Sequence, residues 1–233
     1  MDKPKLILSE LVERFKKSEN PVRAKQQQVY MKNKMEYWGY SSGETRLIAA
    51  HVFKLYPPNN KDEYRRILLY LFKHGTRREE WYAAVFMARK YKKFIIPELI
   101  NTYVEIVKIS QWWDIVDSVA SNLIGPALRD KELRDYLIPW IQDENMWIRR
   151  TALLTQLNYK DLTDFPLLKE LILQVAHEQE FFIRKAIGWA LRQYSYTNPK
   201  AVLRLIVEKG NQLSNLSIRE AQKGMKRIGY IND

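Results

Sequence analysis

Two segments of the chain resemble each other, and the distance between them limits the folds that the chain can adopt. WIRRTALLTQL (147–157) and FIRKAIGWALR (182–192) place apolar and basic residues in the same order, 35 positions apart. Asp114, followed by IVDSVASNL, lies 33 positions before the first copy, and EEWYAAVFMARKY (79–91) lies about 35 positions earlier still. A period of about 35 residues with two helices per unit is typical of a helical solenoid.

Helical spacing extends over nearly the whole chain. Apolar residues recur at intervals of three and four, and Pro21, Pro126 and Pro199 fall where the first turn of a helix tolerates proline. No strand pattern is found. The predicted helices span residues 5–18, 21–34, 43–55, 60–73, 77–91, 95–108, 111–123, 126–137, 144–158, 163–177, 179–194, 197–208 and 215–228.

The repeated basic pattern separates two classes of solenoid. IRR followed by Thr-Ala and IRK followed by Ala resemble HEAT units, whereas the tryptophan pattern of tetratricopeptide repeats is missing. We therefore expect an all-α fold, a curved α-solenoid of about six HEAT-like helix pairs. The whole chain, residues 1–233, is predicted to form a single domain.

The charge balance predicts an anionic partner. The chain has 39 Lys and Arg against 27 Asp and Glu, a formal net charge of +12. Nucleic acid is the preferred partner and a membrane surface the lesser one. Because the second helices of successive repeats lie side by side, they are expected to make one surface, the basic concave face of the curved solenoid, where nucleic acid would bind.

The composition also argues against several classes of site. Cysteine is absent, the three histidines are far apart, and the eight glycines occur singly. We therefore expect no metal site, no cofactor and no nucleotide-binding loop. The N-terminal segment is too charged for a signal peptide and no apolar run is long enough to span a membrane. These features favour a cytoplasmic protein without membrane association.

The segment ISQWWDIVDS (109–118) combines two tryptophans with two aspartates in this basic chain. Helical geometry gathers one set of apolar side chains on a single face, which is expected to be core. Trp113 and Asp117 lie off this face, one turn apart. The residues of the face are Trp112, Ile115, Val116, Val119 and Leu123.

The repeat aligns Asp117 with Arg150 and Lys185, so that the three should form a row on the surface away from the core. Trp113 and Trp189 flank this row. Two interpretations stay open. In one, Asp117 pairs with Arg150 in a solvated ladder and both tryptophans pack between repeats. In the other, the row is an anion-binding groove with aromatic platforms, and its single carboxylate faces a cation such as the sugar during cleavage of a glycosidic bond.

Further basic segments are candidate phosphate contacts. They are YMKNK (30–34), which holds Tyr30 and Lys32, TRREE (76–80) and KGMKR (223–227). Each is more often a solvated helix face.

At these residues the chain resembles the AlkD-like DNA alkylation repair glycosylases, which are built from HEAT-like repeats. The resemblance covers nearly the whole chain. It is most specific at WWDIVDS (112–118) and EFFIRKAIGWALRQY (180–194), and it extends to YMKN, KYKKFI, MWIRR, TNP and LSIREA.

The resemblance implies an activity and a set of roles. Members of the family remove cationic purines alkylated at N3 or N7, such as 3-methyladenine and 7-methylguanine, from duplex DNA and leave an abasic site. They are monofunctional and need no metal. The catalytic aspartate of the family falls on Asp117, its paired tryptophans on Trp113 and Trp189, its phosphate-binding arginine on Arg150 and its N-terminal tyrosine on Tyr30.

From the residues and the resemblance together we expect a glycosylase of base excision repair that acts on double-stranded DNA as a monomer at the bacterial nucleoid. Asp117, Trp113 and Trp189 are the expected catalytic residues. One alternative is a non-catalytic HEAT-repeat protein that senses distorted DNA, and a less favoured one is a protein–protein scaffold. The expected DNA contacts are Arg150, Lys185, Arg149, Arg192, Tyr30 and Lys32.

Overall fold

The computed structural model describes residues 2–232, and helices and short connections account for nearly all of them. Within these residues no β-strand forms, and the one isolated bridge joins Glu36 to Arg77. The prediction of an all-α helical-repeat fold is therefore confirmed. None of the described helices is long and apolar enough to cross a membrane.

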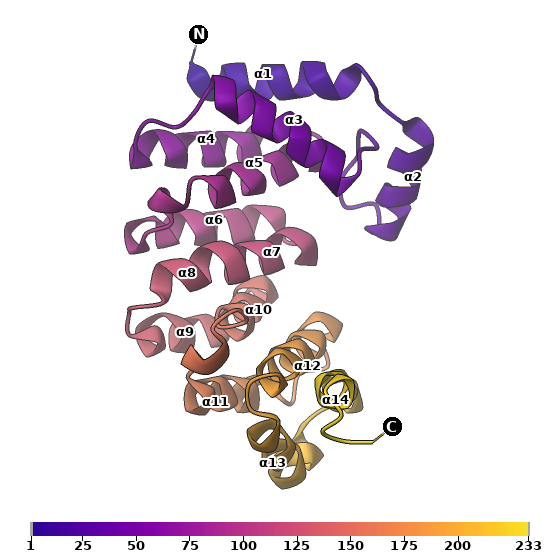
Figure 1. Ribbon diagram of the computed structural model, residues 1–233, viewed down its shortest axis with the longest axis vertical. Coiled ribbons are helices and arrows are strands. Elements are labelled where there is room, and N and C mark those ends of the chain that lie inside the picture. The colour runs from indigo at the N-terminus through magenta and orange to yellow at the C-terminus, as the bar shows by residue number, and fades with distance from the viewer. Residues whose placement is uncertain (1, 233) are drawn as a thin grey trace. The chain divides into compact units, whose positions relative to one another are not determined.

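The chain divides into two compact units, residues 1–115 and 116–233. We call them the N-terminal and C-terminal units and describe each by itself; the single-domain assignment stays a prediction. Helices α1 to α6 of the N-terminal unit are labelled in Figure 1. Their bounds are α1 Lys3–Lys16, α2 Pro21–Tyr30, α3 Ser42–Leu55, α4 Lys61–His74, α5 Arg78–Lys90 and α6 Ile100–Ser110, with short 3-10 turns η1 Lys92–Phe94 and η2 Pro97–Leu99 before α6.

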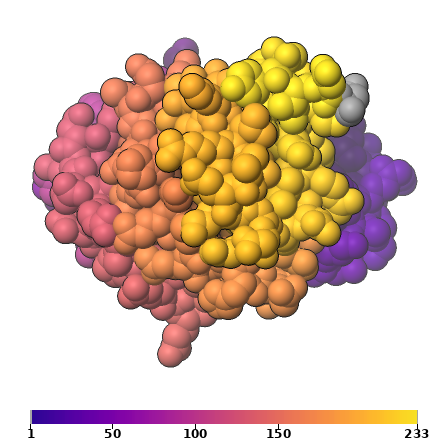
Figure 2. All heavy atoms as spheres, turned by 90° about the horizontal axis from the view of Figure 1, so that it is seen from below, coloured from indigo at the N-terminus to yellow at the C-terminus, as the bar shows by residue number. Residues whose placement is uncertain are grey.

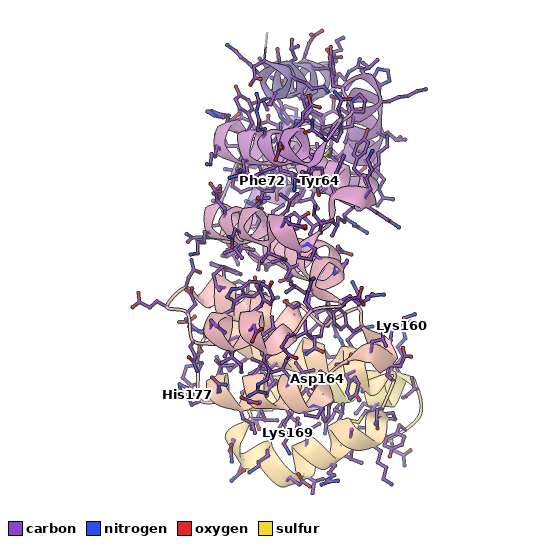
Figure 3. All side chains as sticks on the ribbon, turned by 90° about the vertical axis from the view of Figure 1, so that its left-hand side faces the viewer. Tyr64, Phe72, Lys160, Asp164, Lys169 and His177 are labelled. Atoms are coloured by element: carbon purple, nitrogen blue, oxygen red, sulfur yellow. The ribbon has the colours of Figure 1, made fainter. Side chains whose placement is uncertain are left out.

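The N-terminal unit is built around α4. This helix packs on α1, α5 and α6, and α3 packs on α1 and α5. Tyr64 and Phe72, labelled in Figure 3, are buried side chains of α4. The Tyr64 hydroxyl lies 3.3 Å from that of Tyr103 on α6, so that a buried polar group of one helix is satisfied by the next.

Helix α7, Trp113–Val119, leads into the C-terminal unit. There α9 packs on α10 and α11, α10 packs on α12, and α12 packs on α13 and most extensively on α14 (Figure 1). The bounds are η3 Ala120–Ile124, α8 Gly125–Leu128, α9 Leu133–Ile141, α10 Met146–Leu154, η4 Lys160–Leu162, α11 Phe165–Val175, α12 Phe181–Ser195, α13 Pro199–Lys209, η5 Gly210–Gln212 and α14 Asn215–Arg227.

Hydrogen bonds between successive repeats recur at the predicted spacing. Arg150 bonds to Asp117 across 33 residues, the Tyr159 hydroxyl donates to the Gly125 carbonyl across 34, and Ser217 donates to the Arg184 carbonyl across 33. Side chains of one repeat thus fill hydrogen-bonding positions in the repeat before it. This regularity is what stacking of similar helix pairs produces.

The prediction of one helix at residues 126–137 is wrong. The helical path that starts in α7 continues through η3, a π-helical turn, into α8 and ends after Leu128, and α9 begins only at Leu133. Pro126 therefore lies within a continuing helical segment. The wider π turn alters the backbone pairing at this place. The carbonyls of Ser121 and Gly125 accept hydrogen bonds from the Asn158 side chain and the Tyr159 hydroxyl.

Helix α2 is also shorter than predicted. It ends at Tyr30 and not at residue 34, because Lys32 and Asn33 adopt left-handed backbone conformations, with φ of 58° and 56°. A left-handed residue ends an α-helix. Only Tyr30 of the candidate segment YMKNK thus belongs to α2, and the residues from Met31 on form a turn after the helix and not a helix face.

Candidate functional site

Asp117 and Arg150 form a two-fold hydrogen-bonded ion pair in the C-terminal unit. The Arg150 Nε lies 2.7 Å from Asp117 Oδ1, and Nη2 lies 2.8 Å from Oδ2. Helix α7 supplies the carboxylate and α10 the guanidinium. Because a guanidinium fork matches the two oxygens of a carboxylate, this geometry fixes the plane of the Asp117 side chain.

The same arginine reaches a third repeat. Its Nη1 donates to the backbone carbonyl of Phe182 in the first turn of α12, and its guanidinium lies 5.8 Å from the centre of the Phe182 ring. The Phe182 ring in turn lies 5.0 Å from that of Trp147. Arg150 therefore connects α7, α10 and α12.

Burial of this pair differs from the expectation. Asp117 is 8% exposed and Arg150 4% exposed, so neither stands on an open surface. The repeat alignment correctly predicted that Asp117 and Arg150 are neighbours in successive repeats. The Asp117–Arg150 pair of the first interpretation is therefore present, but it is buried and not solvated. The turn at the start of α12 covers Arg150, because Phe182 lies over it.

The third member of the predicted row has a different partner. Lys185 on α12 lies 3.0 Å from the carboxylate of Glu220 on α14. Arg192, two turns later on α12, lies 3.1 Å from the same carboxylate, and Lys223 lies 2.6 Å from it. The row therefore does not continue as one ladder of ion pairs from Asp117 to Lys185. We call these four residues the Glu220 cluster.

The two predicted tryptophans are half-buried. Trp189 lies on α12 between Lys185 and Arg192, one turn from each. Trp113 is the first residue of α7, and its ring meets that of Tyr30 edge to face, with 6.4 Å between centroids. Tyr30 itself is 72% exposed at the end of α2. Both tryptophans thus retain partly open rings on the helices that carry the predicted charged residues.

Arg149 and Lys32 have different surroundings. Arg149 makes two hydrogen bonds of 2.9 Å to the Glu178 carboxylate and donates to the carbonyls of Asp143 and Glu144. These contacts tie α10 to the connections around it, and the role of Arg149 in binding DNA stays a prediction. Lys32 is exposed on the left-handed turn after α2.

Comparison with known proteins bears on this arrangement. A family model described as DNA alkylation repair enzyme matches residues 11–225, which include every residue named in the site. The chain belongs to the DNA alkylation repair enzyme family. This repair enzyme is also similar to a solved structure described as a predicted DNA alkylation repair enzyme from Enterococcus faecalis. The two are 32% identical, with a TM-score of 0.80, over 88% of this chain and 96% of the other.

No curated protein sequence matches the chain. The family match supports an enzyme of DNA alkylation repair with DNA as its substrate. The fold expected from the family resemblance agrees with the structural similarity.

A second buried ion pair of this repair enzyme was missed by the sequence analysis. In the N-terminal unit, Arg78 on α5 is 2% exposed and forms a two-fold ion pair with Asp114 on α7. The Tyr82 hydroxyl donates to Asp114 over 2.6 Å and lies 3.1 Å from the Tyr37 hydroxyl. The repeat had drawn attention to Asp114 only as an alignment position. Arg78 lies in TRREE, a candidate phosphate contact, but it is buried against Asp114 and does not face an open surface. The separation of 36 residues between Arg78 and Asp114 was the available signal.

This network fixes the first turn of α7, where Trp113 is adjacent to Asp114. Burial raises the pKa of Tyr37 to about 12, the hydrogen bond with Tyr82 opposes this rise, and the Asp114 carboxylate adds to it. Burial likewise raises the pKa of Tyr82, and Asp114 is the next cause. Both phenols therefore remain protonated donors at neutral pH.

Stability of the repair enzyme is expected to fall between pH 10 and 12. The Tyr37 pKa is raised in the folded state, so its contribution is fully present below pH 10, the ordinary pKa of tyrosine, and is lost as the pH rises to about 12. Tyr37→Phe should make the loss of stability with pH shallower by about 1.4 kcal/mol per pH unit in this window. Urea unfolding at several alkaline pH values measures this slope. An unchanged slope would show that Tyr37 ionises equally in both states.

Proposed function

We propose that this repair enzyme is a monofunctional DNA glycosylase that hydrolyses the N-glycosidic bond of cationic N3- and N7-alkylated purines in duplex DNA. The observation that carries the proposal is the carboxylate of Asp117, held by both oxygens on Arg150 and placed one helical turn after the half-buried Trp113. Because Arg150 fixes the plane of this carboxylate, Asp117 can oppose positive charge that develops on a sugar held near Trp113.

The chemistry requires little beyond such a carboxylate. An alkylated purine that already carries a positive charge is a good leaving group. As the C–N bond lengthens, its electron pair returns to the purine and positive charge develops on the deoxyribose, which a fixed carboxylate stabilises. Water adds to the anomeric carbon and gives its proton to Asp117. The products are the neutral purine and an abasic site.

Trp113 and Trp189 are proposed to hold the sugar and the backbone around the lesion. Aromatic rings interact favourably with positive charge on their faces, and they stack in a way that does not depend on sequence. Tyr30, at 6.4 Å from Trp113, would limit the orientation of that ring.

Release of free methylated base is the test of this function. The protein is incubated with duplexes containing 7-methylguanine or 3-methyladenine, and the free base and abasic sites are quantified. Release of base with one abasic site per event supports the glycosylase. Binding to the damaged duplex without release would favour a non-catalytic sensor of damaged DNA instead.

Arg150 is proposed to act mainly by holding the Asp117 carboxylate in place. The family resemblance implies a phosphate contact for Arg150, but three of its N–H groups are directed to protein oxygens. Arg150→Gln should lower base release by about 100-fold, since small misplacements of a reacting group have effects of this size. The slope of log affinity against log salt for undamaged duplex should stay that of the parent protein. A slope shallower by about one unit would instead show a phosphate contact.

Because loss of a buried partner destabilises by about 3–5 kcal/mol, Arg150→Gln must be assayed well below its melting temperature. Arg150→Lys serves as a second variant. It keeps the positive charge but not the fork that matches both carboxylate oxygens. It should bind DNA normally and still release base slowly.

A further inference from the structure

The Glu220 cluster brings three cations from two helices onto one carboxylate in the C-terminal unit. Glu220 Oε1 accepts from Lys185 at 3.0 Å and from Lys223 at 2.6 Å, and Oε2 accepts from Arg192 at 3.1 Å. Three positive charges and one negative charge leave two positive charges that the cluster does not neutralise. An arrangement made only to join α12 and α14 would need one cation for one acid.

The acid of the cluster is more deeply buried than its three cations. The Glu220 side chain is 6% exposed, whereas those of Lys185, Arg192 and Lys223 are 35%, 30% and 58% exposed. Burial opposes ionisation of Glu220, but the hydrogen bonds from Lys223 and Lys185 prevail and lower its pKa. The carboxylate therefore lies ionised beneath a partly open layer of positive charge.

Two glycines make this convergence possible. A Cβ at Gly188 on α12 would lie 2.5 Å from the Glu220 Cβ and 2.8 Å from the Ser217 carbonyl oxygen. A Cβ at Gly224 on α14 would lie 2.7 Å from the Arg192 carbonyl oxygen. Any larger residue at either position would separate the helices. Each of the two helices thus has a glycine where they approach closely. This short separation brings the cations of α12 and α14 around Glu220.

The cluster also adjoins a predicted site residue. Trp189 lies one turn after Lys185 and about one turn before Arg192 on α12, so the two cations bracket the tryptophan along the helix. In Figure 2 the gold and yellow atoms of the last helices form a broad face toward the viewer, so helix α14 stands at the surface of its unit.

We propose that Lys185, Arg192 and Lys223 form a binding site for one phosphate of the DNA backbone, with Glu220 as the positioning residue that holds the three cations together. The ligand is a phosphodiester, because duplex DNA is the partner and the exposed oxygens of its backbone phosphates can accept from several donors at once. The proposal rests on the proposed function only in taking duplex DNA as the partner. It makes α14 a part of the DNA-binding surface.

The test measures binding to an undamaged duplex by fluorescence anisotropy between 50 and 200 mM salt, a range chosen because phosphate contacts are strongly salt-dependent there. Lys223→Ala should weaken binding several-fold at the lowest salt and make the salt slope shallower by up to about one unit. Lys223→Arg should keep both values. The matched control is Lys200→Ala, which removes an exposed lysine of α13 in the same unit. Equal losses for Lys223→Ala and Lys200→Ala would overturn the phosphate site.

The positioning role of Glu220 is tested by coupling. Lys223→Ala is introduced into Glu220→Gln, a variant of the same shape without the charge. If Glu220 places Lys223, removal of the lysine should reduce affinity by a smaller factor in this background than in the parent. An equal factor in both backgrounds would overturn the positioning role.

Thermal melts accompany each variant, and Lys223 is open enough for its substitution to leave the fold intact. Because binding to undamaged DNA is measured, this result is independent of base release. A protein that releases no methylated base would end the glycosylase proposal and leave the phosphate site to be decided by the salt series.

Discussion

Asp117→Asn is expected to lower the single-turnover rate of base release by about 100-fold or more. Asparagine keeps the shape but not the charge that opposes positive charge on the sugar, and removal of one electrostatic stabiliser of a transition state commonly has an effect of 10²–10³. Affinity for undamaged duplex should hold or rise, since a negative charge is removed from a DNA-binding protein. The assay is quantification of free 7-methylguanine under enzyme excess.

Burial of the pair changes what this variant does to the fold. From the sequence, Asp117 on a surface helix face predicted nearly intact folding. In the structure its loss leaves Arg150 buried without its ionic partner, which costs about 3–5 kcal/mol. The double variant Asp117→Asn, Arg150→Gln removes both charges and should recover much of that stability without recovering activity. Full base release by either variant would remove Asp117 from the mechanism.

Trp112→Ala and Trp113→Ala are expected to separate stability from activity. Trp112 is 9% exposed, and its ring is covered by the Lys34 ammonium at 4.8 Å from the centroid. Truncation opens a core cavity, and we expect a loss of about 3–5 kcal/mol in the free energy of unfolding. Trp113 is half-buried against Tyr30, so its truncation should cost only about 1 kcal/mol.

Activity should follow the reverse order. Folded Trp112→Ala should release base at close to the parent rate, whereas Trp113→Ala should release it far more slowly, because the ring proposed to contact the DNA is lost. Chemical unfolding and single-turnover release on the two proteins decide between the roles. An early melt and normal release for Trp113→Ala would assign both rings to the core. Tyr30→Phe is a control, because phenylalanine keeps the ring that meets Trp113 edge to face.

Most of the fold was predictable because helix and repeat signals are local. Periods of three and four place each apolar stripe, and the caps are short-range. Ser41, for example, accepts from the Glu44 backbone at the start of α3. The end of α2 was less predictable, because it depends on the left-handed backbone of Lys32 and Asn33. Lysine and asparagine also occur within helices, so the sequence alone does not mark this end.

The sequence predicted that Asp117 and Arg150 are paired, but it did not predict that the pair is buried. A period of about 35 brings Asp117 next to Arg150 in the neighbouring repeat. A helical wheel, however, gives only the direction of a side chain from its own helix. It does not include the first turn of α12, whose Phe182 carbonyl and ring close over Arg150. The partnership of Lys185 with Glu220 likewise depends on the helix separation set by Gly188.

The π-helical turn at Ala120–Ile124 has a consequence for how this family is aligned. A π turn holds one residue more than an α turn, so side chains after Gly125 are rotated by about 100° from where an uninterrupted α-helix would put them. A relative with regular α-helix here would need one residue fewer between Asp117 and the residue equivalent to Pro126. An alignment that allows no gap at this place would shift every later position by one, and it would then equate Arg149, which holds Glu178, with Arg150, which holds Asp117.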